Sequence, residues 1–107
     1  MAKNDAQNEK ATRVARELGS ALKRQARRRW ETVRTAERNE GPRHVWRFKP
    51  GPDGTDRFLY VTHEALTTGE DPTPVLLEQL KAGRWLDRLD GAETTLVLSK
   101  GGSLEAA

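Results

Sequence analysis

The stretch HVWRFKPGPDGTDRFLYV, residues 44 to 61, decides the fold of this chain. Its first six residues alternate between two sides, with His44, Trp46 and Phe48 on the same side, which is the pattern of a β-strand. The middle, PGPDGTD, is dense in turn-forming residues, and Asp53-Gly54 is a strong signal for a tight turn. The last five residues, RFLYV, form a second strand, so the stretch predicts a β-hairpin.

Three further elements are expected after the hairpin, within a body that spans residues 43–99. EDPTPVLLEQLKAG predicts a short helix, because its prolines suit the first turn and Gly83 suits the end. RWLDRL adds a helical turn, and TTLVLS at residues 94–99 predicts a third strand. The last residues, 100–107, read KGGSLEAA and are expected to form a flexible tail.

A long basic helix is expected before the hairpin, over residues 9–40, after a disordered N-terminus of residues 1–8. The helical stretch contains no proline and is rich in alanine, arginine, glutamate and leucine, which favour helix. Gly19-Ser20 is a point at which this helix can break, since glycine costs about 1 kcal/mol relative to alanine. A narrow apolar stripe lies along one side of the predicted helix: Ala11, Ala15, Leu18, Leu22, Ala26, Val33 and Ala36.

The predicted fold is therefore α+β: a long N-terminal helix followed by a small three-stranded sheet, the hairpin plus one strand, covered by a short helix. The order is α-β-β-α-β. The body has too few large apolar residues to be stable alone, so the N-terminal helix or a second copy of the chain must cover one face of the sheet. With the extra helical turn counted, the element order is similar to that of type II KH-like RNA-binding domains. RNA-binding members of that family carry Gly-x-x-Gly between the two middle helices, whereas this junction has only Gly83.

Charge is distributed unevenly along the chain. Residues 1–40 hold eleven basic and six acidic side chains, a net charge of +5, so the remaining 67 residues carry −2 of the total of +3. This asymmetry favours an anionic partner for the N-terminal segment, or contact between that segment and its own acidic body. The chain has no cysteine and no apolar run of the roughly 18 residues that a membrane span needs, so a cytoplasmic location without membrane contact is expected.

Recognisable catalytic or metal-binding motifs are missing from the sequence. No Gly-x-Ser-x-Gly elbow and no phosphate-binding glycine loop occurs, and the two histidines, His44 and His63, lack metal-site spacing. A domain of this size has little room for a deep pocket. We therefore expect no enzymatic activity, no metal, no cofactor and no small-molecule substrate.

The basic helix carries the strongest functional signal. From Leu18 to Trp30 the chain has five basic residues and no acid. Two like-charged pairs, Lys23 with Arg27 and Arg24 with Arg28, stand at the unfavourable i,i+4 spacing, which phosphates or acidic side chains would relieve. The leading hypothesis is a small binding protein whose helix contacts the backbone of RNA or DNA without strong sequence specificity. Its predicted nucleic-acid-binding residues are Arg13, Arg16, Lys23, Arg24, Arg27, Arg28 and Arg34.

The alternative is a protein–protein interaction module or homodimer that pairs through the apolar stripe of the helix. The misplaced base is Arg29, which falls on that stripe and should either reach solvent or meet an acid. The four aromatic residues of the hairpin would be a stacking platform for nucleic acid if they faced solvent. Because the chain is short of large apolar residues, we expect them in the core instead: Trp46, Phe48, Phe58 and Tyr60.

Overall fold

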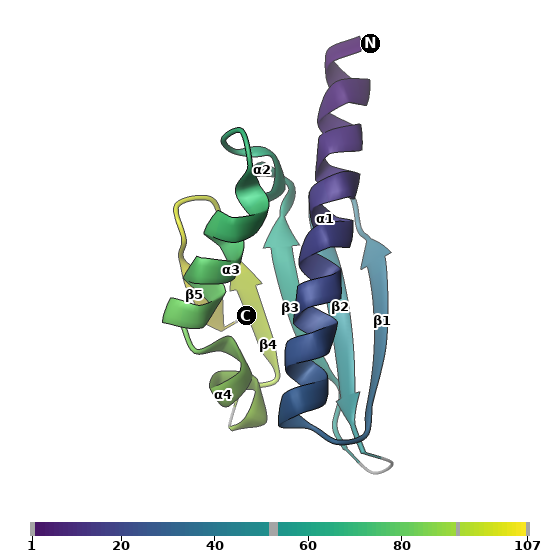
Figure 1. Cartoon of the computed structure of the whole chain (residues 1–107), viewed down its shortest axis with the longest axis vertical. Coiled ribbons are helices and arrows are strands. Elements are labelled where there is room, and N and C mark those ends of the chain that lie inside the picture. Colours follow the sequence, from purple (N-terminus) through teal and green to yellow (C-terminus); the bar gives the residue numbers. More distant parts are fainter. Residues whose placement is uncertain (1, 52–53, 92, 107) are drawn as a thin grey trace.

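The structure of the chain, a computed structural model, describes residues 2–51, 54–91 and 93–106. A five-stranded sheet forms one layer, and the helices lie together on one side of it (Figure 1). The elements in chain order are α1 (Ala2–Arg29), β1 (Val33–Asn39), β2 (Arg43–Pro50), β3 (Arg57–Thr62), α2 (His63–Thr67), α3 (Pro72–Ala82), α4 (Trp85–Asp90), β4 (Thr95–Leu98) and β5 (Leu104–Ala106).

The sheet is mixed, with its strands in the spatial order β1-β2-β3-β4-β5. Every neighbouring pair is antiparallel except β3 and β4, which are parallel because α2, α3 and α4 carry the chain back between them. The α+β class and the N-terminal helix are confirmed. The predicted three-stranded sheet and the order α-β-β-α-β are wrong in detail, because the sheet has two further strands at its edges, β1 and β5. The order therefore also differs from the KH-like order, because β1 stands between the first helix and the hairpin.

The first correction concerns the end of the long helix. It ends at Arg29, and residues 33–39, which we expected to be helical, form the edge strand β1. Nothing in the local sequence stops a helix here, since neither proline nor glycine occurs between Arg29 and Gly41. The strand forms because it pairs with β2 along its whole length, from Val33 opposite Pro50 to Asn39 opposite His44. Tertiary pairing outweighs helix propensity, which is a weak preference for each residue.

The start of α1 and its glycine also differ from expectation. The helix begins at Ala2, so residues 2–8, which we expected to be disordered, are helical. It is continuous through Gly19-Ser20. A Cβ atom added at Gly19 would lie 2.8 Å from Nε1 of Trp46 and 3.3 Å from Oε2 of Glu37. The glycine therefore serves close packing of the helix on the sheet, and not a break.

The predicted hairpin is confirmed as β2 and β3, with Trp46 opposite Leu59. Asp53, half of the predicted tight turn, lies outside the described residues. The short helix and the helical turn are confirmed as α3 and α4, and the third predicted strand is β4, which pairs with β3.

The C-terminal segment ends the sheet on its other edge. Residues 104–106, which we expected in a flexible tail, form β5 and pair with β4, with Leu104 opposite Leu98. The connection contains two glycines with positive φ, Gly101 and Gly102, a conformation that other residues rarely adopt. Leu104 packs against the core beside Gly83, and so holds the short strand in place.

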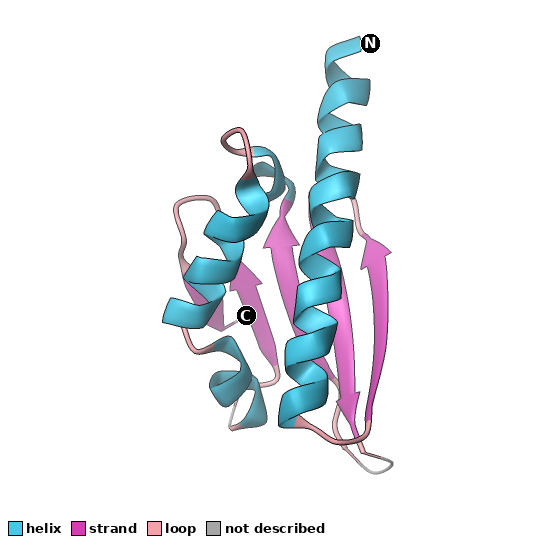
Figure 2. Ribbon diagram, in the orientation of Figure 1, coloured by secondary structure: helices cyan, strands magenta, loops and turns pink. Residues whose placement is uncertain are grey.

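The core lies between the helix layer and one face of the sheet (Figure 2). Helix α1 contributes its stripe, of which Leu18 and Leu22 are fully buried, and the sheet contributes Trp46, Phe48 and Leu59. Of the two expected ways to cover one face of the sheet, the N-terminal helix or a second copy of the chain, the structure has the helix. Among the described residues, no helix is both long enough and apolar enough to cross a bilayer.

Candidate nucleic-acid interface

Helix α1 presents a row of arginines to solvent, on the side turned away from the sheet. We call the exposed side chains of Arg13, Arg16, Arg24 and Arg27 the outer ridge. They lie opposite the buried stripe because the helix turns about 100° per residue. Within the part of the chain that the structure describes, no carboxylate lies within ion-pair distance of these four. The ridge is a row of charge that its own fold leaves uncompensated.

The other three predicted contact residues do not belong to the outer ridge. Lys23 turns toward the sheet, where its Nζ donates to Oε1 of Glu37 at 3.0 Å. Arg28 lines a groove between α1 and the helices α3 and α4. Arg34 is not on the helix at all, because it belongs to β1. The predicted set is thus divided among four places: the outer ridge, the contact of α1 with Glu37, the groove beside α3 and α4, and strand β1.

Arg29 meets acids from the body, as one of our two expectations for it required. Its guanidinium lies 3.0 Å from Oδ1 of Asp87 and 2.8 Å from Oδ2 of Asp90. Trp30 Nε1 donates to Asp90 Oδ1 at 2.8 Å. This hydrogen bond, and then Arg29, lower the pKa of the Asp90 carboxyl against the opposing effect of burial. The end of α1 is therefore tied to α4.

The far face of the sheet is the second basic surface. Side chains alternate along a strand, so the neighbours of the core residues on β1, β2 and β3 point away from the helices. No helix of the described chain covers this side, which we call the open face (Figure 2). It carries five basic side chains, all on the first two strands: Arg34, Arg38, Arg43, Arg47 and Lys49.

Two of these cations stand directly opposite each other. Arg34 on β1 pairs in register with Lys49 on β2, and the next pair on this face joins Ala36 to Arg47. Like charges at opposed positions of a sheet destabilise it, by an amount comparable to the gain of an opposite-charge pair, roughly 0.2–1 kcal/mol. If this face of the sheet only had to be soluble, an acidic residue in place of Arg34 or Lys49 would make the sheet more stable.

The open face also carries two aromatic side chains that we expected in the core. Phe58 and Tyr60 on β3 are half-buried, with ring centres 6.5 Å apart and planes inclined by 23°. The guanidinium carbon of Arg43 lies 4.0 Å from the centre of the Tyr60 ring. The expectation is confirmed for Trp46 and Phe48 and is wrong for Phe58 and Tyr60. Their positions differ because of the β2–β3 register. Trp46 stands opposite Leu59, which faces the core, whereas Phe58 stands opposite Arg47, which faces the other side of the sheet.

A groove on the open face brings the rings and cations together. Its lining includes Phe58, Tyr60, Arg38 and Arg47. Acids are present but few. Glu40, which pairs with Arg38, and Glu37, whose carboxylate bonds to Lys23 on the covered side, line the groove, and Glu105 lies on the edge strand β5. The face is consequently basic around an aromatic centre.

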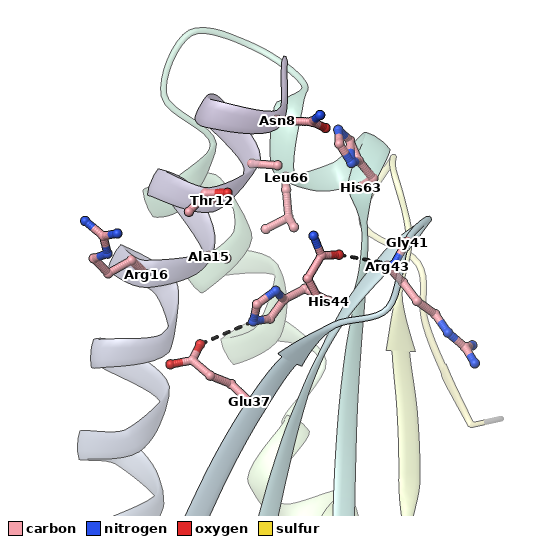
Figure 3. Close-up of a pocket in the computed structure, with 12 residues that line it drawn as sticks. Asn8, Thr12, Ala15, Arg16, Glu37, Gly41, Arg43, His44, His63 and Leu66 are labelled. Carbon is pink, nitrogen blue, oxygen red and sulfur yellow. Dashed lines mark hydrogen bonds and ion pairs between the residues drawn. The ribbon is translucent and has the colours of Figure 1, made fainter. Parts of the chain in front are cut away.

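A cavity of about 250 Å³ lies between the first half of α1, α2 and the ends of β1 and β2 (Figure 3). His44 and Glu37 face each other in it, with His44 Nε2 3.2 Å from Glu37 Oε2, while Arg16 and Arg43 extend away from its centre. His63 lies at the opposite end. Groups of three or more metal-ligating side chains are not found among the described residues.

Glu37 is the hub of this region and holds three elements together. It accepts hydrogen bonds from Lys23 on α1 at 3.0 Å and from Trp46 on β2 at 3.1 Å, besides its contact with His44. Burial raises the pKa of the Glu37 carboxyl, but the hydrogen bonds from Lys23 and His44 outweigh burial, so its pKa lies below its usual value. The hydrogen bonds of Glu37 therefore give these four side chains a structural role, because they link helix α1 to strands β1 and β2.

From the sequence, the hairpin aromatics would form a stacking platform only if they faced solvent, and all four were expected in the core, so the open face was not predicted as a site. A signal was present in the hairpin, since Val45, Arg47 and Lys49 alternate with the core residues and two of the three are basic. No such signal placed Arg34 and Arg38 on this face, because both residues belonged to the predicted helix. Only the pairing of β1 with β2 brings the two groups onto one face.

Comparison of the chain with protein-family models, with curated proteins and with solved structures finds no significant match in any of the three.

Proposed function

We propose that this chain is a small, non-enzymatic binding protein whose basic helix contacts the backbone of nucleic acid, RNA or DNA, without strong sequence specificity. The outer ridge would make the phosphate contacts, with Arg28 at its margin. Such binding needs no cofactor. Its free energy comes from the counterions that leave the nucleic acid when arginines neutralise its phosphates.

One observation carries the proposal: four exposed arginines in a row without an acidic partner among the described residues. Two bases of the same helix that turn toward the body, Lys23 and Arg29, each have a carboxylate partner, whereas Lys10 donates to the backbone oxygen of Gly69. In the described part of the chain, carboxylates thus pair with two inward-turned bases and with none of the four ridge arginines. From Arg13 to Arg27 the ridge spans about 21 Å at 1.5 Å per residue, the length of about six nucleotide steps at 3.4 Å each.

The alternative, pairing of two chains through the apolar stripe, has less support. Leu18 and Leu22 are fully buried against this chain's own sheet. A second chain could reach the stripe only if α1 left the sheet and exposed the core.

A salt titration tests the proposal. Binding of fluorescently labelled RNA and DNA of mixed sequence should weaken steeply as salt rises. Replacement of Arg24 and Arg27 by glutamine removes two phosphate contacts. It should lower the slope of log affinity against log salt by about 1.4 for single strands, and the affinity at roughly 100 mM salt by about tenfold or more.

The matched control is Lys81→Gln with Lys100→Gln, which changes the net charge by the same amount at exposed positions of α3 and of the β4–β5 connection. Its slope should stay close to that of the unaltered protein. Equal losses in both double variants would mean that only total charge matters, and salt-independent binding, or none, would overturn the proposal.

A further inference from the structure

We infer that the open face of the sheet is a second binding surface, one that takes the unpaired bases of a single-stranded nucleic acid. This goes beyond the proposed function, because it concerns a different surface and a different kind of contact. The outer ridge would read only backbone phosphates, which single strands and duplexes share. The open face would distinguish the two, since duplex bases are stacked on each other and cannot lie flat on protein rings.

The stacking centre is a short row of planar groups. Arg43, Tyr60 and Phe58 follow one another diagonally across β2 and β3, with the 4.0 Å and 6.5 Å separations given above. Aromatic rings and arginine guanidinium planes are the two surfaces on which proteins stack unpaired bases. Both rings are half-buried, so the strand holds them while part of each stays accessible.

The cations lie where the backbone of a stacked strand would run. Arg38 and Arg47 line the groove beside the rings, and Arg34 and Lys49 continue the basic surface along β1 and β2. A phosphate between Arg34 and Lys49 would turn their mutual repulsion into two attractive contacts. The least favourable pair of the sheet would then become favourable in the complex.

Charge decides between nucleic acid and the other obvious occupant, a second copy of the chain. Two open faces placed together would bring five cations against five, and the acids near them among the described residues are fewer: Glu37, Glu40 and Glu105 of each copy. Glu40 is already engaged by Arg38. A polyanion with flat apolar groups matches both the charge and the rings of this face, whereas a second copy matches only the rings.

The test compares three probes of similar length: an oligothymidine of about 12 nucleotides, a duplex, and an abasic strand that has phosphates but no bases. The unaltered protein should bind oligothymidine about tenfold or more tightly than the abasic strand. Tyr60→Thr and Phe58→Thr, which keep strand-forming residues, should each remove about 5- to 100-fold of affinity for oligothymidine and leave binding of the abasic strand unchanged. Neither should change the salt slope.

The control is Val75→Ala, which shortens an exposed apolar side chain on α3 and should change no affinity. Circular dichroism melting shows whether each variant is folded. Where a threonine variant does not fold, Arg47→Gln provides the readout, with a salt slope for oligothymidine lower by about 0.7.

Equal affinity for all three probes would overturn the inference and leave the proposed phosphate contacts of α1 intact. A concentration-independent dimer in light scattering, lost in Tyr60→Thr, would also overturn it, because a second copy would then cover the face. Oligothymidine binding that depends on Tyr60 but not on Arg24 and Arg27 would support the inference and overturn the proposed function instead.

Discussion

The two faces of the sheet are made from the same strands and have opposite characters. Leu59 and Tyr60 are adjacent on β3, yet Leu59 is fully buried beneath the helices and Tyr60 lies half-buried on the open face. Trp46 and Arg47 show the same division on β2, with the tryptophan in the core and the arginine exposed. One step along a strand therefore separates a residue that holds the fold together from one that is available to a partner.

This difference shows how a chain with few large apolar residues can form a sheet and still present a functional surface. A sheet that is mostly antiparallel, as this one is, needs only one face covered, and here α1, α2, α3 and α4 all lie on that face. The face left open can then carry cations and rings that would be unfavourable in a core. The comparison predicts that substitutions on the two faces will affect different measurable properties.

The largest expected effect on stability comes from Leu59→Ala. It removes a fully buried side chain, and large-to-small changes in a core cost about 2–5 kcal/mol of unfolding free energy. Urea denaturation measures the loss, and the fraction that stays folded should bind nucleic acid as before. For Tyr60→Thr, one residue away, we expect about 1 kcal/mol or less and a clear loss of affinity. Similar stability losses in both variants would contradict the division between the faces.

A second prediction concerns the contact between helix and sheet at Gly19. The Cβ of Gly19→Ala would lie 2.8 Å from Trp46 Nε1, which is shorter than a normal contact. The Trp46 ring is fully buried, so the ring or the helix would have to shift. Overpacking costs about 1–3 kcal/mol and the better helix propensity of alanine returns about 1 kcal/mol, so we expect a net loss of about 0–2 kcal/mol. The neighbouring exposed Ser20→Ala should be almost neutral in the same denaturation assay. A gain in stability for Gly19→Ala would show that the helix does not pack so closely.

A third prediction concerns Glu37, which links Lys23 and His44 across the covered side. Its pKa is lowered in the folded state, so the ionised carboxylate stabilises the fold at pH values above the ordinary pKa of a glutamate side chain. That contribution is lost as pH falls through the lower folded value, and the lowered pKa of Asp90 acts in the same direction. The unfolding free energy should therefore decrease on acidification below about pH 4.

The variant Glu37→Gln separates the two carboxyls. It should be less stable than the unaltered protein at neutral pH, and this difference should shrink as pH falls, because the unaltered carboxyl is then protonated as well. Urea denaturation at several pH values measures it. A difference that stays constant down to pH 3 would contradict the role of the ionised carboxylate.

The smallest expected effect concerns the open face. Arg34→Glu would place an acid opposite Lys49 and replace a repulsive pair by an attractive one, with a gain of about 0.2–1 kcal/mol in unfolding free energy. The same change should weaken nucleic-acid binding and lower its salt slope. Arg34→Gln, which only removes the repulsion, should lie between the two proteins in both measurements. Increased stability with unchanged binding would place Arg34 outside the interface.

Much of the fold could be predicted because its signals are local. The alternation of residues 44–61 predicted the hairpin, and the prolines and Gly83 predicted α3. The alanine-leucine stripe as far as Ala26 was likewise predicted from helical periodicity, although its partner, the sheet or a second chain, was not. Each of these signals lies within one element and needs no knowledge of what packs against it.

By itself, the sequence determined the α+β class, the central elements and the excess of basic residues before residue 41, because periodicity, turn residues and charge are properties of the chain alone. The tertiary structure decided that residues 33–39 and 104–106 are edge strands, since only pairing with β2 and β4 outweighs their weak local preferences. It also decided the surfaces. Pairing of β1 moves Arg34 and Arg38 from the expected helix to the far face of the sheet, where they meet Arg43, Arg47 and two aromatic rings.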